Sequence, residues 1–178
     1  QTPENVEGVK LAGALGAGIL STMREQALAG VTPRDLDAIA ADMFRDAGAV
    51  SAPVLTYGFP AQTCISVNRV VAHGIPTGVP LRDGDLVNID VSAEKGGYFS
   101  DTGAPFPVPP LPRQVERLCK DGRRAMWAGL PDVGAGHPLA GIGRAVGALP
   151  TKNCPPPARN PPRPGPRLAP PHAPPPRP

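Results

Sequence analysis

Two β-rich runs flank a short glycine turn near the middle of this chain. The runs are DLVNIDVSA (85–93) and GYFSDTGAPFPV (97–108), and the tetrapeptide EKGG (94–97) joins them. Alternating apolar and polar residues on both sides of a Gly-containing turn are the pattern of a β-hairpin. An antiparallel pair of strands is therefore predicted here, and the rest of the chain must pack around it.

One aspartate lies in each run, Asp90 in the first and Asp101 in the second. The midpoint between them falls between Lys95 and Gly96, so the hairpin is expected to place the two side chains directly opposite each other on one face. Opposed Cβ atoms are roughly 4.5–5.5 Å apart, and like charges in that arrangement are destabilising. A divalent cation between them is the natural compensation, because it prefers hard oxygen ligands. The alternative is a register shifted by one residue, which would leave both as ordinary polar residues on a solvated face.

His73 lies in VVAHGIPTG, directly after a β-rich run at 64–71 and before a Gly-Ile-Pro turn. A loop histidine at the end of a strand can reach into a cleft and donate a hydrogen bond to a substrate carbonyl. The alternative is a surface or partly buried loop histidine with no such role.

Helices are predicted on both sides of this β-rich region. Apolar residues at helical spacing predict helices over 4–29 and 32–46, and helical character returns over 113–128 and 137–149. The fold class is therefore α+β, with helices first, then an antiparallel meander, then helices.

The first two helices have recognisable starts and apolar stripes. Thr2 and Thr32 are the expected N-caps, and each precedes a proline at the first helical position. The apolar residues at helical spacing in the first helix are Val6, Val9, Leu11, Leu15, Ile19 and Met23. The stripe expected to be buried in the second helix consists of Leu36, Ile39, Ala40, Met43 and Phe44.

The character of the sequence changes near residue 153. Residues 154–178 hold 13 of the 27 prolines and four arginines but no acidic residue. Such a segment cannot bury enough apolar surface to offset its ordering entropy, so a disordered, partly polyproline II tail is predicted. We expect a domain over 1–153 and a tail over 154–178. Because Pro, Arg, Ala and Gly have GC-rich codons, a reading-frame shift would explain that tail.

Charge and cysteine content exclude several classes of protein. The four tail arginines account for all of the net positive charge, because residues 1–153 carry a net charge of −1, so no nucleic-acid partner is inferred. Three widely spaced cysteines without a CxxC motif argue against a disulfide framework or a structural zinc site and favour a cytoplasmic location. No apolar run is long enough for a membrane span, and a monomer is expected.

Taken together, GFPAQTCISVNRVVAHGIP (58–76) and LRDGDLVNIDVSAEKGGYFSDT (81–102) resemble the type I methionine aminopeptidases, and the resemblance extends over about residues 4–152. It implies a pita-bread fold that binds two divalent ions, Co, Mn, Fe or Zn, through five side chains. Two of these ligands match Asp90 and Asp101.

The resemblance also implies other site residues and an activity. His73 matches the histidine that contacts the substrate, Phe59 and Cys64 match positions lining the pocket for the methionine side chain, and Ser92 matches a hydroxyl close to the metals. The implied reaction is metal-assisted removal of the N-terminal methionine from nascent peptides, at the ribosome.

The chain departs from the family pattern after the second aspartate. The remaining ligands, one His and two Glu, have no matching motif, and no Glu follows Glu116. We therefore expect a truncated fold and a catalytically incomplete chain. The alternatives are a different pita-bread peptidase, such as a proline dipeptidase, and a non-catalytic protein whose Pro-rich tail binds aromatic grooves.

Overall fold

The computed structural model describes residues 2–149, and it begins with two capped helices. Helix α1 is Pro3–Gln26, and the Thr2 hydroxyl accepts a hydrogen bond from the Asn5 N–H at 3.3 Å. Helix α2 is Pro33–Asp46, and Thr32 and Asp35 form a reciprocal capping box at its start. Both predicted starts are confirmed. The first helix ends three residues earlier than predicted, and Gly30 lies in the turn that follows it.

The buried face of α1 differs from its stripe of large apolar residues. Val6, Val9 and Leu11 are exposed, whereas Ile19 and Met23 are fully buried. Small residues make up the rest of the buried face of α1, because this helix lies close to a strand. A Cβ added to Gly16 would be 3.0 Å from the Ser100 hydroxyl. Hydrophobic periodicity weights large side chains and therefore misses a contact made through glycine and alanine.

Four antiparallel strands form one sheet. They are β1 (Val50–Ser51), β2 (Cys64–Val67), β3 (Leu86–Lys95) and β4 (Tyr98–Pro107). β4 pairs along one edge of β3, and β1 and β2 follow each other along the other edge, so β2, β3 and β4 form the predicted meander.

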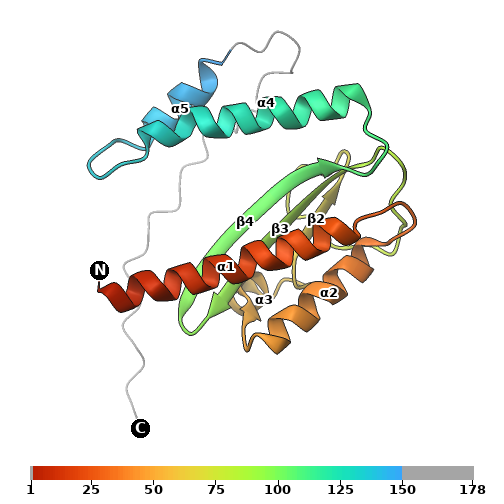
Figure 1. Ribbon diagram of the computed structural model, residues 1–178, viewed down its shortest axis with the longest axis horizontal. Helices are drawn as coiled ribbons and strands as arrows, with labels where there is room; N and C mark the ends of the chain where they lie inside the picture. Colours follow the sequence, from red (N-terminus) through yellow and green to blue (C-terminus); the bar gives the residue numbers. More distant parts are fainter. Residues whose placement is uncertain (1, 150–178) are drawn as a thin grey trace. The chain divides into compact units, whose positions relative to one another are not determined.

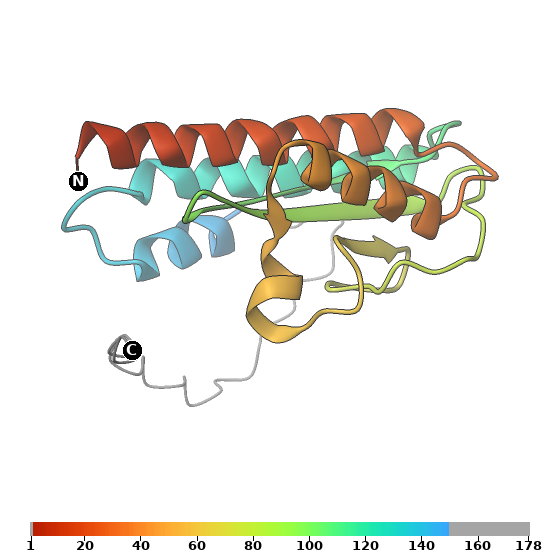
Figure 2. The ribbon, with the colours of Figure 1, turned by 90° about the horizontal axis from the view of Figure 1, so that it is seen from below.

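The two faces of the sheet have different roles. α1 and α2 cover one face, and the short helix α3 (Ala52–Tyr57) lies on the other (Figures 1 and 2). Alternation along β3 separates these faces. Its odd-numbered residues point into the core beneath the helices, and Asp90 and Ser92 point to the face that carries α3. The core residues of β3 are Val87, Ile89, Val91 and Ala93.

The described residues divide into two compact units, one that ends at Arg123 and one that begins at Arg124. Helix α4 (Arg113–Gly129) begins in the first unit and ends in the second, close to its predicted bounds. In the second unit, the 3₁₀ turn η1 (Leu130–Asp132) precedes α5 (Ala140–Gly147), which lies within the range predicted for the last helix. The predicted tail, 154–178, lies outside the described residues. Among residues 2–149, no helix is long and apolar enough to cross a membrane.

Candidate active site

The hairpin register differs by two residues from the predicted one. Lys95 pairs with Tyr98, so the turn consists of Gly96 and Gly97, which have φ values of +61° and +86°. Tight hairpins favour positive φ at both central residues, and glycine adopts it without strain. The turn is therefore centred on the two glycines.

The predicted direct opposition of the two aspartates is wrong as a consequence. Asp90 pairs with Gly103, and Asp101 pairs with Ser92. Side chains alternate with a period of two, so a shift of two residues leaves both carboxylates on the predicted shared face. They are diagonal neighbours, a position at which Cα atoms are about 7–8 Å apart.

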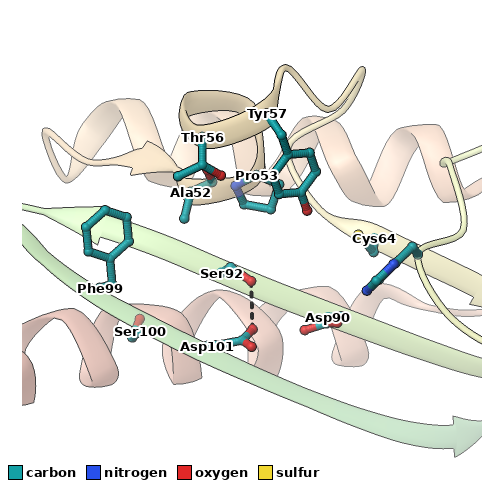
Figure 3. Close-up of a pocket in the computed structure, with 11 residues that line it drawn as sticks. Ala52, Pro53, Thr56, Tyr57, Cys64, Asp90, Ser92, Phe99, Ser100 and Asp101 are labelled. Atoms are coloured by element: carbon teal, nitrogen blue, oxygen red, sulfur yellow. Dashed lines mark hydrogen bonds between the residues drawn. The ribbon is translucent and has the colours of Figure 1, made fainter. Parts of the chain in front are cut away.

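Both carboxylates line a cavity of about 420 Å³ between the sheet and α3. Figure 3 shows Asp90, Ser92 and Asp101 on the sheet, with Ala52, Pro53, Thr56 and Tyr57 of α3 facing them. Cys64 and His73 also line it. Five of the six residues predicted for the site, Cys64, His73, Asp90, Ser92 and Asp101, therefore meet in one cavity.

The carboxylates of Asp90 and Asp101 repel each other. Burial raises the pKa of Asp90, and the negative charge of Asp101 raises it further. Asp101 accepts a hydrogen bond of 2.6 Å from the Ser92 hydroxyl, which fixes one of its oxygens (Figure 3). The two carboxylates are thus like-charged neighbours, and a bound cation would offset the repulsion between them.

Cys64 begins β2 and pairs directly with Asp90. Its side chain is buried, and burial is the main cause that raises the pKa of its thiol, followed by the charges of Asp90 and Asp101. The thiol therefore stays protonated at neutral pH and presents a small apolar surface to the cavity.

His73 is held in an unusual backbone conformation. Its φ is +53°, in the left-handed region that few residues other than glycine adopt. The next residue, Gly74, is clamped to β2: its carbonyl accepts a hydrogen bond from Ile65 at 2.8 Å, and its N–H donates to the Ser66 hydroxyl at 3.1 Å. A Cβ at Gly74 would overlap the Ile65 carbonyl oxygen. Because residue 74 is a glycine, the loop can lie close to β2, and this contact fixes the backbone position of His73.

Phe59 is the predicted site residue that does not line the cavity. Its ring packs edge-on against Tyr57, with centroids 6.3 Å apart and an interplanar angle of 72°. Tyr57 lines the cavity instead, as does Phe99 of β4. Desolvation raises the pKa of Tyr57, and the charges of Cys64, Asp90 and Asp101 add to the effect.

The sequence pattern predicts neither Tyr57 as a site residue nor the short helix α3 that carries it. A signal was present: Ser51 caps the helix, Pro53 lies in its first turn, and Gly58 ends it with a φ of +66°.

Comparison with known proteins identifies the family of this fold. The sequence model that defines metallopeptidase family M24 matches residues 7–160 of this chain. The chain belongs to metallopeptidase family M24. The M24 domain is 44% identical over 154 residues to a methionine aminopeptidase from Staphylococcus epidermidis, covering 86% of this chain and 61% of that relative. The family resemblance is thereby confirmed.

Solved structures agree with this assignment. The crystal structure of methionine aminopeptidase from Rickettsia prowazekii matches with a TM-score of 0.73 and 30% identity, over 83% of this chain and 59% of that one. The M24 domain therefore has the pita-bread fold. The prolidase from Pyrococcus furiosus, with a TM-score of 0.67 and 19% identity over 82% of this chain and 43% of that one, shares the fold alone. The chain spans about 60% of the length of the methionine aminopeptidases it matches.

The aspartate pair of this M24 domain fits a divalent ion. Carboxylate oxygens are ligands that divalent ions prefer, and the charge of such an ion would offset the repulsion from Asp101 that, together with burial, raises the pKa of Asp90. Within residues 2–149, no group of three or more His, Cys, Asp or Glu side chains converges as a ligand set. The described part of the M24 domain thus offers two neighbouring carboxylates as candidate metal ligands.

Proposed function

We propose that this M24 domain carries the aspartate half of a methionyl aminopeptidase site. The observation that supports it most is the gathering of Asp90, Asp101, Cys64 and His73 around one cavity, in a chain 44% identical to methionine aminopeptidases. The proposed substrates are peptides with an N-terminal methionine, and nascent chains at the ribosome would supply them in the cytoplasm.

Each residue at the cavity has a proposed role. Asp90 and Asp101 would hold the divalent ions, and Ser92 keeps the carboxylate of Asp101 in a fixed orientation. A bound divalent ion would supply a water of lowered pKa for peptide hydrolysis. His73 would donate a hydrogen bond to the substrate near the scissile bond. Cys64, together with Phe59 behind the cavity wall, would accommodate the methionine side chain.

Two carboxylates are fewer than a catalytic dinuclear centre requires, because each ion takes at least three or four ligands. The sequence has no glutamate after Glu116 to add to them. We therefore propose that the 178-residue chain binds a divalent ion weakly, behaves as a monomer and has little peptidase activity of its own. Mn²⁺, Co²⁺, Fe²⁺ and Zn²⁺ are all suitable ions for these oxygen ligands.

Metal titration tests the proposal. Mn²⁺ binding to the 178-residue chain is measured by calorimetry for the unaltered protein, Asp90→Asn and Asp101→Asn. Asp83→Asn is the control, because Asp83 is exposed and outside the cavity. Each cavity variant is expected to bind Mn²⁺ at least about tenfold more weakly, since each removes one of two charged ligands. Equal affinity of all four proteins would contradict the proposed site.

A peptide assay tests the activity separately. Release of methionine from Met-Ala-Ser is measured with added Mn²⁺ or Co²⁺. We expect little or no release. Metal-dependent release that Asp101→Asn abolishes would instead show that the chain completes its own catalytic centre.

The two alternative functions are less well supported. The hypothesis of a proline-specific dipeptidase rests on a structural likeness at 19% identity, which shows the fold alone. The methionine aminopeptidases, by contrast, match this chain in sequence. The Pro-rich binding function depends on residues 154–178, which lie outside the described residues.

A further inference from the structure

Strand β4 forms an edge of the sheet (Figure 1). Among residues 2–149, β3 is the one strand that pairs with it, so the other side of β4 has no partner strand there. The two-residue turn makes Lys95 and Tyr98 the closing hydrogen-bonded pair of the hairpin, and the backbone bonds to β3 recur at every second residue from there. Even-numbered residues of β4 therefore bond to β3, whereas the backbone groups of its odd-numbered residues point away from the hairpin.

This open edge presents N–H donors along only part of its length. Phe99, Asp101 and Gly103 each carry an outward N–H and are exposed, but Pro105 and Pro107 carry no N–H at all. Prolines on an edge strand block pairing with another strand, so they limit the edge at one end, and the hairpin turn limits it at the other. The stretch left for pairing is centred on Asp101.

A second copy of the chain fits this stretch because the stretch is complementary to itself. When two β4 strands pair antiparallel about Asp101, Phe99 of each copy faces Gly103 of the other, and each outward N–H meets an outward carbonyl. The Phe99 side chain is 53% exposed and would cover the glycine, which has no side chain of its own to pack. On the opposite face, Ser100 faces Thr102 of the other copy, a cross-strand pair whose hydroxyls can hydrogen-bond.

The same pairing brings carboxylates from both copies together. Asp101 would lie directly opposite Asp101 of the second copy, with Cβ atoms roughly 4.5–5.5 Å apart, and Asp90 of each copy would lie on the same face. Like charges in this arrangement oppose the pairing, so the metal-free chain stays a monomer. Divalent ions would offset these charges, and two copies together supply more oxygen ligands than the single pair that one copy offers.

We propose that a second copy of this chain pairs with β4 about Asp101 and contributes its own Asp90 and Asp101 to the site, and that divalent ions strengthen this dimer. The pairing is carried by the open edge and its register. The dependence on metal rests on the proposed function, which assigns the ions to the two aspartates.

Sedimentation velocity and hydrogen exchange test the pairing. The 178-residue chain is measured over a range of concentrations, once with Mn²⁺ and once with a chelator. We expect a monomer with the chelator and a dimer with Mn²⁺, with a dissociation constant at least about tenfold lower when Mn²⁺ is present. In the dimer, the amides of Phe99, Asp101 and Gly103 should exchange at least about tenfold more slowly than in the monomer, because each gains an acceptor. The amide of Ser100 already bonds to β3 and should be protected in both states.

Two variants of Phe99 test the edge directly. Phe99→Pro removes one outward N–H, and it leaves the bonds to β3 in place because that N–H points away from the hairpin. It should dimerise at least about tenfold more weakly. Phe99→Leu is the matched control, because it keeps the N–H and an apolar side chain, and it should dimerise nearly as well as the unaltered chain. Thermal unfolding shows whether each variant is folded, and if Phe99→Pro is not, the exchange rates of the unaltered chain decide.

Three results would overturn the pairing. They are assemblies larger than a dimer, a dimer whose outward β4 amides exchange as fast as in the monomer, and a folded Phe99→Pro variant that dimerises as tightly as Phe99→Leu.

Calorimetric titration with Mn²⁺ separates the pairing from the proposed function. Mn²⁺ binding by a chain that stays monomeric contradicts the pairing and leaves the metal site standing. A dimer with protected edge amides that binds no Mn²⁺ supports the pairing and contradicts the metal site.

Discussion

Ser92 lies directly across the hairpin from Asp101 and donates a 2.6 Å hydrogen bond to its Oδ1 atom. The pair forms because the turn is centred on Gly96 and Gly97, and this register moves Asp90 to the diagonal position. One aspartate is thus oriented by a neutral hydroxyl, while the other is desolvated and has a raised pKa. A hydroxyl that restrains a metal-binding carboxylate commonly contributes to metal affinity.

Removal of this hydroxyl should weaken metal binding without unfolding the chain. Ser92→Ala is expected to lower Mn²⁺ affinity about tenfold, because Asp101 loses the partner that orders one of its oxygens. Ser92→Thr keeps a hydroxyl on the same atom and should bind almost normally. Calorimetric titration of both variants checks this, and an Ala variant that binds as tightly as the Thr variant would show that Ser92 does not orient the ligand.

The sequence was sufficient to predict the hairpin and the shared face of its aspartates, because both follow from an alternation with a period of two. It was insufficient for the register. The prediction centred the turn between Asp90 and Asp101, whereas the backbone preference of Gly96 and Gly97 for positive φ decides where the turn forms. The positive-φ preference of the turn glycines predicts the paired residues better than the positions of the two aspartates do.

The wall of the cavity was harder to predict. α3 is six residues long and its Val, Leu, Thr and Tyr residues read as a strand, so only its Ser51 cap and Gly58 end indicated a helix. His73 and Cys64 were placed near the aspartates by the family resemblance. Their meeting in space depends on the clamp between Gly74 and β2, which no periodicity in the sequence encodes.

Gly74→Ala should destabilise the chain strongly. The added Cβ would overlap the Ile65 carbonyl oxygen, so the loop that carries His73 must move away from β2 and lose its hydrogen bonds there. We expect a loss of about 2–3 kcal/mol in the free energy of unfolding, measured with urea. Gly18→Ala is the matched control, because Gly18 is an exposed residue within α1 and a Cβ there meets no atom within 4 Å. That control should be neutral or stabilising by up to about 1 kcal/mol. Equal effects of the two substitutions would contradict the clamp.

Asp37 anchors the segment that leads into β2. Its carboxylate accepts hydrogen bonds from the Gln62 N–H at 3.1 Å, from the Thr63 N–H at 2.8 Å and from the Thr63 hydroxyl at 2.7 Å. Thr63 is fully buried, so Asp37→Ala leaves polar groups without partners and should cost about 2–3 kcal/mol in urea unfolding.

Asp42→Ala is the comparison for that variant. Asp42 lies on the same helix and forms a surface ion pair with Arg45, at 2.7 Å. Its loss should cost less than about 1 kcal/mol. If Asp37→Ala is no more destabilising than Asp42→Ala, the Asp37 contacts do not hold this segment.

The capping box of α2 should make stability depend on pH. Asp35 accepts hydrogen bonds from the Thr32 hydroxyl at 2.6 Å and from the Thr32 N–H at 3.0 Å, and these bonds lower its pKa below the ordinary value of 3.8. A carboxyl group whose pKa is lower in the folded state than in the unfolded state stabilises the fold above the unfolded value, and this contribution is lost as pH falls through the folded value. Asp35→Asn should therefore lower the urea midpoint at pH 7, and the difference from the unaltered chain should shrink between about pH 4 and pH 2. Thr32→Ser preserves both donors and should retain the pH dependence. A difference that stays constant over this range would show that the charge on Asp35 does not contribute to the cap.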